Sequence, residues 1–247
     1  MFIWFIVLNN SYFWNINYDN CMKKILLSVF CLLISYSAFS QNDENYNYSI
    51  GLKAYNVMQM PKILNQTNSD DYMHAYLNSI LVKFNDNQIS YRIKANYFKK
   101  NISFNNQCAN CEIAEGYMKD YAFTVGFEKV LNYAKVQPYF GTDIGFRVNN
   151  FTGDVKTVNT KNTSLPYNVD AEKNGLVIAP LLGIKVSPFK QVSFFVETSL
   201  DFYYSYERQE TIQQDAANTR SFAKYNKWEL LLNPLAVGIQ IHLVSKN

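Results

Sequence analysis

The sequence predicts an all-β fold, an eight-stranded antiparallel transmembrane β-barrel with short periplasmic turns and long extracellular loops. Two observations predict it. Apolar and polar residues alternate along about eight segments, as between Gln137 and Val148, and this period of two is that of a strand with one apolar and one polar face. The connections between these segments alternate between short and long, which is typical of a barrel whose two ends face different compartments.

The eight expected strands cover residues 46–56, 75–84, 88–98, 117–130, 136–149, 175–187, 191–206 and 227–243. The short connections lie near 85–87, 131–135 and 188–190, and the long ones cover 57–74, 99–116, 150–174 and 207–226. An even number of strands places both ends of the barrel domain on the side of the short turns, which is the periplasmic side of an outer-membrane barrel.

Within these segments the apolar side chains share one face. That face is carried by Ile89, Tyr91 and Ile93 in the third segment, by Tyr121, Phe123 and Val125 in the fourth, by Phe140, Ile144 and Phe146 in the fifth, by Phe194, Val196 and Phe202 in the seventh, and by Leu235, Val237 and Ile239 in the eighth. No charged residue falls on this face in the middle of these strands, where a charge facing lipid would cost about 2–4 kcal/mol. The apolar face is therefore the one expected to meet lipid.

Composition agrees with a membrane protein. Aromatic residues make up 16% of the chain and charged residues 17%, whereas soluble proteins usually carry about 25% charged residues. Tyr and Phe in excess suit the girdles at the two membrane interfaces. The net charge of +3 argues against nucleic acid as a partner.

The N-terminal region reads as a targeting segment. Residues 22–40 contain a short basic stretch, an apolar run from Ile25 to Tyr36 and small residues before Gln41, as in a cleaved secretory signal peptide. Residues 1–21 have no role in this scheme, so we expect them to be a mis-assigned upstream extension, with translation starting at Met22. A genuine extended leader is the alternative. Residues 41–247 then form the outer-membrane barrel domain.

The polar face is expected to line the lumen. Its charged residues are Lys53, Lys83, Arg92, Lys94, Arg147 and Lys185, together with Asp120, Glu128, Asp143, Glu197 and Asp201. Eight strands leave a lumen that side chains can fill, and buried charges need partners. We therefore expect an ion-pair network that closes the lumen, with a narrow conducting path as the alternative.

No residue pattern predicts a catalytic, cofactor or metal site. Cys108 and Cys111 lie in the second long loop and are expected to form a local disulfide, with a metal site or a reactive pair as alternatives. A hydrolase or acyltransferase would need a base beside a nucleophile. Only His74, with Ser69 or Ser79 within reach along the sequence, offers that combination at the outer rim.

Two stretches carry a family resemblance. Ala179–Lys185 and Phe194–Asp201 resemble the outer-membrane β-barrel family common in Bacteroidetes, the porin-family or PorT-like group of small barrels. The last strand resembles the signal read by the barrel assembly machinery, with Gly238, Ile241 and Leu243 at the expected spacing. It departs from that signal at Ala236, where a polar residue is usual, and in its ending Ser245–Asn247, which lacks an aromatic residue.

The resemblance implies residence in the bacterial outer membrane, in contact with outer-membrane lipid and lipopolysaccharide, and insertion by the assembly machinery. It implies no single activity, because a fold does not fix a function. The leading expectation is a non-enzymatic envelope protein that is structural or binds an envelope protein partner through its loops. The alternatives are a PorT-like accessory protein of a secretion system, a narrow porin-like channel and a lipid-modifying enzyme.

Overall fold

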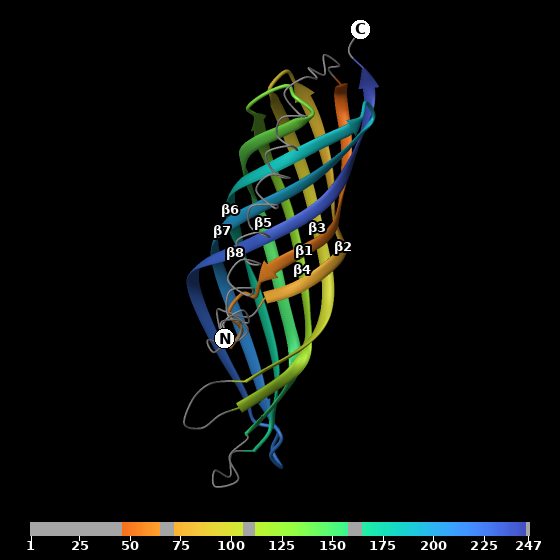
Figure 1. Ribbon diagram of the computed structural model, residues 1–247. Coiled ribbons are helices and arrows are strands. Elements are labelled where there is room, and N and C mark those ends of the chain that lie inside the picture. The colour runs from red at the N-terminus through yellow and green to blue at the C-terminus, as the bar shows by residue number, and fades with distance from the viewer. Residues whose placement is uncertain (1–45, 65–71, 106–111, 158–164, 246–247) are drawn as a thin grey trace, which may run out of the picture.

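The chain folds into a closed barrel of eight antiparallel strands that follow one another in sequence order, with β8 returning to pair with β1. This architecture comes from a computed structural model that describes residues 46–64, 72–105, 112–157 and 165–245. Figure 1 shows the strands winding obliquely around one axis. The prediction of an all-β barrel of eight antiparallel strands is confirmed. In the described ranges no helix is long and apolar enough to cross a membrane.

The strands are β1 (Tyr46–Gln59), β2 (Tyr72–Asp86), β3 (Ile89–Asn105), β4 (Glu112–Val130), β5 (Val136–Thr157), β6 (Tyr167–Phe189), β7 (Val192–Gln213) and β8 (Arg220–Ser245). Each contains the centre of an expected segment, but six of them reach well beyond the expected bounds on the side of the long loops. The expected loops 99–116, 150–174 and 207–226 were therefore wrong in extent, because most of their residues are strand.

The extension has a physical cause that is visible along β4. Between Tyr121 and Phe127 the apolar residues point outward; beyond Lys119 the outward residues are Tyr117 and then Glu115, and the inward one between Lys119 and Tyr117 is Met118. The alternation persists while its phase inverts, from apolar-outward to apolar-inward. β5 does the same: Phe151 and the residues that follow it alternate with polar residues on the outside. The outward apolar face stops at this inversion, whereas the strand continues. Strand bounds set by that face are therefore too short.

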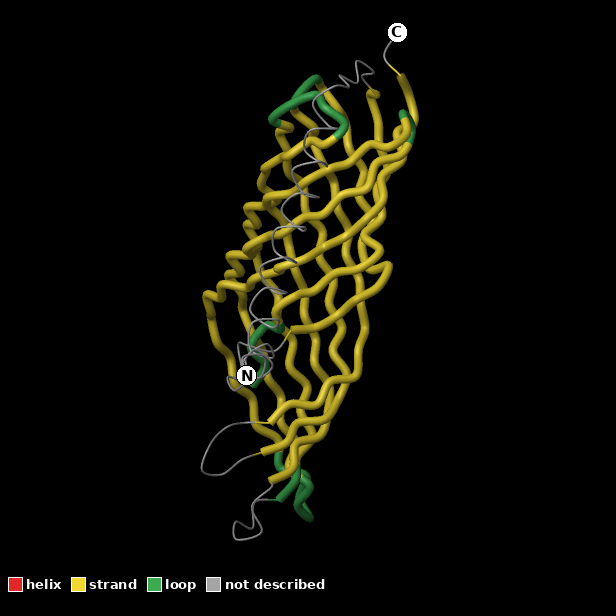
Figure 2. Tube along the Cα trace, viewed as in Figure 1, coloured by secondary structure: helices red, strands yellow, loops and turns green. Residues whose placement is uncertain are grey.

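The two ends of the barrel differ. The connections 87–88, 131–135 and 190–191 lie at the end where β8 finishes, and the strand ends that border the four longer connections lie on the opposite side (Figures 1 and 2). Asn87 closes the first short turn with a φ of 55°, a left-handed conformation that asparagine tolerates. β3 to β8 extend farther from the short turns than β1 and β2, so one side of the barrel wall is taller (Figure 1).

Candidate functional site: the barrel lumen and its two ends

Arg92 is the centre of a buried ion-pair network in the half of the lumen nearer the short turns. Its Nη1 lies 2.8 Å from Glu197 Oε2 and 3.1 Å from Glu128 Oε2. Its Nε lies 3.0 Å from Asp143 Oδ1, a charge contact that lacks the geometry of a hydrogen bond. Removing any one of these buried partners would leave a charge without compensation, which is strongly unfavourable.

Each of these three carboxylates also binds one lysine. The pairs are Lys53–Glu197 at 2.9 Å, Lys83–Glu128 at 2.6 Å and Lys94–Asp143 at 2.6 Å. The residues of the network come from β1, β2, β3, β4, β5 and β7, so the contacts cross the lumen and join strands that are not neighbours. The network therefore fixes the shape of the barrel from inside.

Strand irregularities help to aim two members of the network. The register of β1 shifts between Lys53 and Tyr55, and that of β7 shifts between Glu197 and Ser199. Bulges of this kind re-aim side chains. Here they lie directly beside Lys53 and Glu197, which bind each other.

A second set of ion pairs lies nearer the long loops. Arg147 Nε donates to Asp120 Oδ2 at 2.9 Å, and its Nη1 lies 3.4 Å from Asp201 Oδ2. Two further pairs complete the set, Lys173–Glu229 and, at 2.8 Å, Lys227–Glu207. Sequence reasoning missed these last two pairs because their residues fall in strand extensions that had been assigned to loops or to the strand end.

The structure brings together ten of the eleven charged residues expected to line the lumen. Those in ion pairs are Lys53, Lys83, Arg92, Lys94, Asp120, Glu128, Asp143, Arg147, Glu197 and Asp201. Lys185 is the exception: it is buried, at 7% exposure, but has no ion pair within the described part of the chain.

Two glycines leave room for aromatic rings that pack inside this network. Gly183 lies opposite Tyr139 and Gly238 lies opposite Phe195. A Cβ at either glycine would overlap the facing ring. The Tyr139 hydroxyl donates to Glu197 Oε2 at 3.3 Å, and Lys83 Nζ lies 5.6 Å and 5.7 Å from the Tyr139 and Phe195 ring centroids. Gly238, expected as part of an assembly signal, thus has a packing role, while the other two residues of that expected signal, Ile241 and Leu243, face outward and are exposed.

Nearer the long loops the lumen also holds a cluster of apolar side chains, which sequence reasoning did not predict. Its buried side chains form one cluster: Met58, Met60, Ile63, Leu64, Met73, Ala75, Phe98, Phe104, Ala114, Met118, Phe151, Val155, Val169 and Ala171. The segment 60–64, expected to be part of an outer loop, enters this cluster. Lys62 holds it in place, because its amide donates to Glu229 Oε1 at 2.8 Å and its carbonyl accepts from Lys173 Nζ at 3.0 Å.

Between the ion-pair network and the apolar cluster lies a small polar chamber of about 40 Å³. Asn56, Asn96, Thr124 and Asn233 line it, and each has a buried oxygen whose hydrogen-bonding capacity no described protein group takes up. The chamber has room for about three waters, at roughly 10–15 Å³ each. On the side of the long loops, Met58 of the apolar cluster lines it.

The short-turn end opens into a second cavity, the short-turn vestibule, of about 70 Å³. It is lined by Asn85, Ser90, Gln137, Lys185, Ser187 and His242, among others. A hydrogen-bonded chain crosses its floor: Ser187–Ser193 at 2.8 Å, Ser193–His242 at 2.7 Å, His242–Ser49 at 2.9 Å, Asn85–Ser49 at 2.8 Å and Ser90–Asn85 at 2.8 Å.

Neither histidine is arranged for nucleophilic catalysis. His242 lies beside Ser49 and Ser193, but both serines are fully buried and cannot reach a substrate. His74 Nδ1 lies 2.7 Å from the Tyr55 hydroxyl on the outer surface, whereas Ser79 is buried on the lumen side of the wall. Ser69 lies outside the described residues, as do Cys108 and Cys111, the signal segment 22–40 and the stretch 1–21.

The end of the barrel beyond the apolar band carries its own polar contacts. The Tyr167 hydroxyl donates to Glu112 Oε2 at 2.9 Å, and partial burial together with this hydrogen bond raises the pKa of Tyr167. In the exposed turn between β7 and β8, hydrogen bonds from the Thr219 hydroxyl and amide lower the pKa of Asp215. In the described ranges no group of three or more His, Cys, Asp or Glu residues is placed to hold a metal.

Similarity to known proteins is found in the fold and not in the sequence. No protein-family model matches the chain, and no curated protein sequence matches it. Among solved structures, the chain is similar to a major outer membrane protein from Thermus thermophilus, with a TM-score of 0.48 and 10% identity over 79% of this chain and 99% of that one. It is also similar to Neisserial surface protein A, with a TM-score of 0.41 and 11% identity over 82% and 100%. At these identities the likeness concerns the fold alone.

Proposed function

We propose that the chain is an integral outer-membrane β-barrel protein without enzymatic activity, exported through a cleaved signal peptide. The inversion of the strand pattern supports this proposal most directly. A water-soluble barrel would keep apolar residues inside along its whole length. Here the short-turn half has charges inside and apolar residues outside, whereas in the long-loop half β4 and β5 carry apolar residues inside and mostly polar residues outside. Lipid around the short-turn half favours its apolar outer face, and water around the long-loop half favours its polar outer face.

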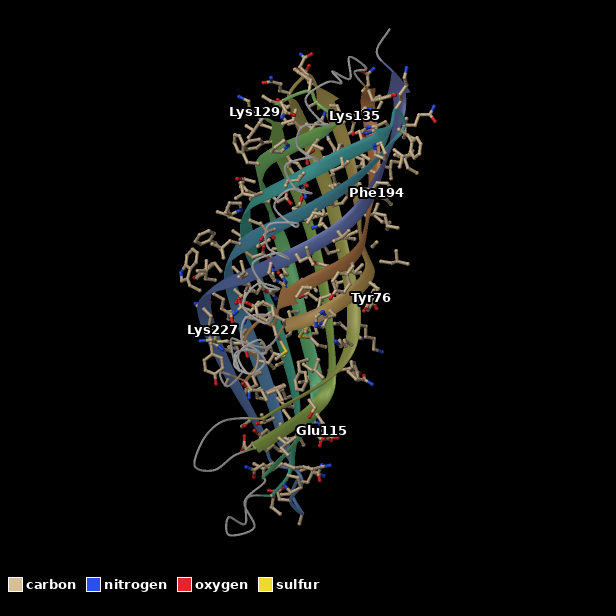
Figure 3. All side chains as sticks on the ribbon, in the orientation of Figure 1. Tyr76, Glu115, Lys129, Lys135, Phe194 and Lys227 are labelled. Carbon is tan, nitrogen blue, oxygen red and sulfur yellow. The ribbon has the colours of Figure 1, made fainter. Side chains whose placement is uncertain are left out.

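The length of the apolar band on β4 agrees with a bilayer. Its outward side chains between Lys119 and Lys129 are Tyr121, Phe123, Val125 and Phe127, all exposed. Ten residue steps at about 3.4 Å cover about 34 Å of strand. At a tilt of about 40° this is about 25 Å along the barrel axis, the height of the apolar band in outer-membrane barrels. Figure 3 shows Lys129 near the short turns and Glu115 near the opposite end.

Aromatic and basic side chains border the band on the long-loop side. Tyr97 and Tyr121 pack with ring centroids 4.9 Å apart, and one step farther Lys99 lies directly opposite Lys119. Lys99 Nζ lies 4.7 Å from the Tyr117 ring centroid. Amphipathic rings and basic groups of this kind suit the headgroup level of a membrane, where phosphates of outer-membrane lipid and lipopolysaccharide would accept contacts from lysine.

The closed lumen supports an interaction role for the protein and does not favour transport. The apolar cluster and segment 60–64 fill one half of the lumen and the network around Arg92 fills the other. We propose that the taller wall and the long loops meet an envelope protein partner or serve a structural role. A stable large conductance in planar bilayers would contradict this closed state.

The narrower resemblance stays a proposal. Assignment to the PorT-like group, and a secretion-accessory role with it, rests on the stretches 179–185 and 194–201, supported by the strand from Tyr139 to Phe146 and the expected mature start at Gln41. Recognition by the barrel assembly machinery rests on the spacing of Gly238, Ile241 and Leu243. Cross-linking followed by identification of the captured partner would separate an accessory role from a purely structural one.

Cell fractionation combined with gel mobility tests the proposed location. The protein should be recovered in the outer-membrane fraction, and the unheated sample should migrate differently from the boiled sample, because the closed barrel resists detergent until heated. Recovery in a soluble fraction, with no shift on heating, would contradict the proposal.

A further inference from the structure

One buried charge in the lumen lacks the compensation that all the others have. Thirteen charged residues of the described chain are at least nine-tenths buried: Lys53, Lys83, Arg92, Lys94, Arg147, Lys173, Lys185, Asp120, Glu128, Asp143, Glu197, Glu207 and Glu229. Twelve of them form ion pairs. The thirteenth, Lys185, forms none within the described ranges, so its charge has no direct partner where it lines the lumen.

The charges around Lys185 do not supply what it lacks. The acid whose charge acts on it is Glu128, which already binds both Lys83 and Arg92. In this half of the lumen five cations, Lys53, Lys83, Arg92, Lys94 and Lys185, face three carboxylates, Glu128, Asp143 and Glu197. With all five cations protonated, the cluster carries two more positive than negative charges.

Lys185 lines the short-turn vestibule, and the vestibule is built from groups that suit an anion. Lys190 and the side-chain amide of Gln137 also line it, together with the Ser187 hydroxyl, whereas the Ser90 hydroxyl donates to Asn85. Among the described residues that line the cavity, none carries a carboxylate. Asp86, in the neighbouring turn, accepts a hydrogen bond from the Asn87 side-chain amide at 3.2 Å and does not line the cavity.

We propose that the short-turn vestibule binds a small oxyanion through the Lys185 ammonium group. The anion would supply the missing negative charge. The cavity of about 70 Å³ holds about five water-sized groups, and inorganic phosphate has five non-hydrogen atoms. Phosphate and short carboxylates therefore fit inside the cavity. Charge-assisted hydrogen bonds of this kind are about twice as strong as neutral ones.

The site lies inside the barrel and depends only on the closed fold, so it does not rest on the proposed membrane location. Because the vestibule opens at the end with the short turns, the ligand would enter from the compartment that these turns face. No bond is made or broken; the step is reversible binding.

Binding of inorganic phosphate to the refolded barrel in a neutral detergent tests the proposal by isothermal titration calorimetry. The wild-type protein should bind one phosphate saturably, and Lys185→Met should weaken binding at least tenfold. The matched control is Lys135→Met, which removes the same charge from an exposed position in a turn at the same end and should bind like wild type. Acetate titrated in parallel separates a general oxyanion site from one selective for phosphate.

Folding of each variant is checked by heat-modifiable migration, and Lys185→Arg provides a second variant that keeps the charge. Lys185→Arg should retain phosphate binding if Lys185→Met loses it. Absence of saturable phosphate binding by the wild type would overturn the proposal. So would equal weakening by Lys135→Met, which would indicate nonspecific attraction to the basic end.

Discussion

Glu128 offers the sharpest test of the ion-pair network, because its charge can be removed without changing its shape. Glu128→Gln keeps the volume of the side chain and one carbonyl oxygen, so no cavity is created. In the native structure Glu128 Oε1 accepts a hydrogen bond from Lys83 Nζ at 2.6 Å, and its Oε2 accepts from Lys83 Nζ at 2.7 Å and from Arg92 Nη1 at 3.1 Å. The carboxylate is fully buried.

The expected loss of stability follows from these contacts. Removing one partner of a buried ion pair costs about 3–5 kcal/mol, because the opposite charge is left without compensation. In Glu128→Gln the five cations of this half of the lumen would face only Asp143 and Glu197. We therefore expect the free energy of unfolding to fall by about 3–5 kcal/mol.

Urea unfolding of the barrel in lipid vesicles measures this change, with linear extrapolation to water. Trp228 is the single tryptophan of residues 41–247 and reports the transition by fluorescence. The matched control is Glu210→Gln, whose carboxylate lies 3.5 Å from Arg220 at the exposed end and should change stability by no more than about 1 kcal/mol. A loss of stability in Glu128→Gln no larger than that of the control would refute the reasoning.

Three further predictions concern the outer wall, the apolar cluster and the contact of Gly238 with the Phe195 ring. Val125→Arg, in the middle of the apolar band, should lower stability in vesicles by about 2–4 kcal/mol, whereas Thr152→Arg on the water-facing wall should leave it nearly unchanged; equal effects would argue against a lipid-facing band. Phe151→Ala should cost about 3–5 kcal/mol in urea unfolding, because it opens a cavity in the buried cluster. Gly238→Ala should cost about 1–3 kcal/mol in the same assay, since its methyl group would overlap both the Phe195 ring and the Leu52 carbonyl oxygen; an unchanged free energy of unfolding would contradict this packing role.

The fold could be predicted because a strand in a membrane barrel repeats a simple pattern. The alternation along 136–149, with Phe140, Ile144 and Phe146 outward, marks a strand without any knowledge of its neighbours. The order of long and short connections then sets the topology. Both signals are local in sequence, and this explains why the number and order of the strands were predicted correctly.

The long-loop half of the barrel was missed for an equally physical reason. Beyond Lys119 and Val148 the strands leave the apolar band: Met118 and Phe151 point inward, and past Tyr117 on β4 and past Val148 on β5 the outward residues are mostly polar. The extensions could have been recognised from the same alternation of apolar and polar residues, with the apolar residues at the inward positions. The inward course of segment 60–64 had no comparable signal, because it depends on Lys173 and Glu229, more than a hundred residues away along the chain.

The candidate lumen residues were named from strand phase within the expected segments, which left out the pairs Lys173–Glu229 and Lys227–Glu207. Which of them pair could not be read from the sequence, because Lys53 meets Glu197 across the lumen through two strand irregularities. For the same reason the sequence did not indicate that Lys185 lacks an ion pair. A nearly balanced count of inward charges suggests complete pairing, whereas in the described part of the chain Lys185 has no paired carboxylate.

The inversion of strand phase on β4 is tested most directly by measuring which outward positions touch lipid. In a Trp228→Phe background, a single tryptophan is placed at Val125 or at Glu115, and its fluorescence is recorded in vesicles of ordinary and of brominated lipid. We predict strong quenching by brominated chains at Val125 and none at Glu115. Equal fluorescence in both kinds of vesicle at Val125, or quenching at Glu115 as strong as at Val125, would contradict the inversion as the boundary between lipid and water.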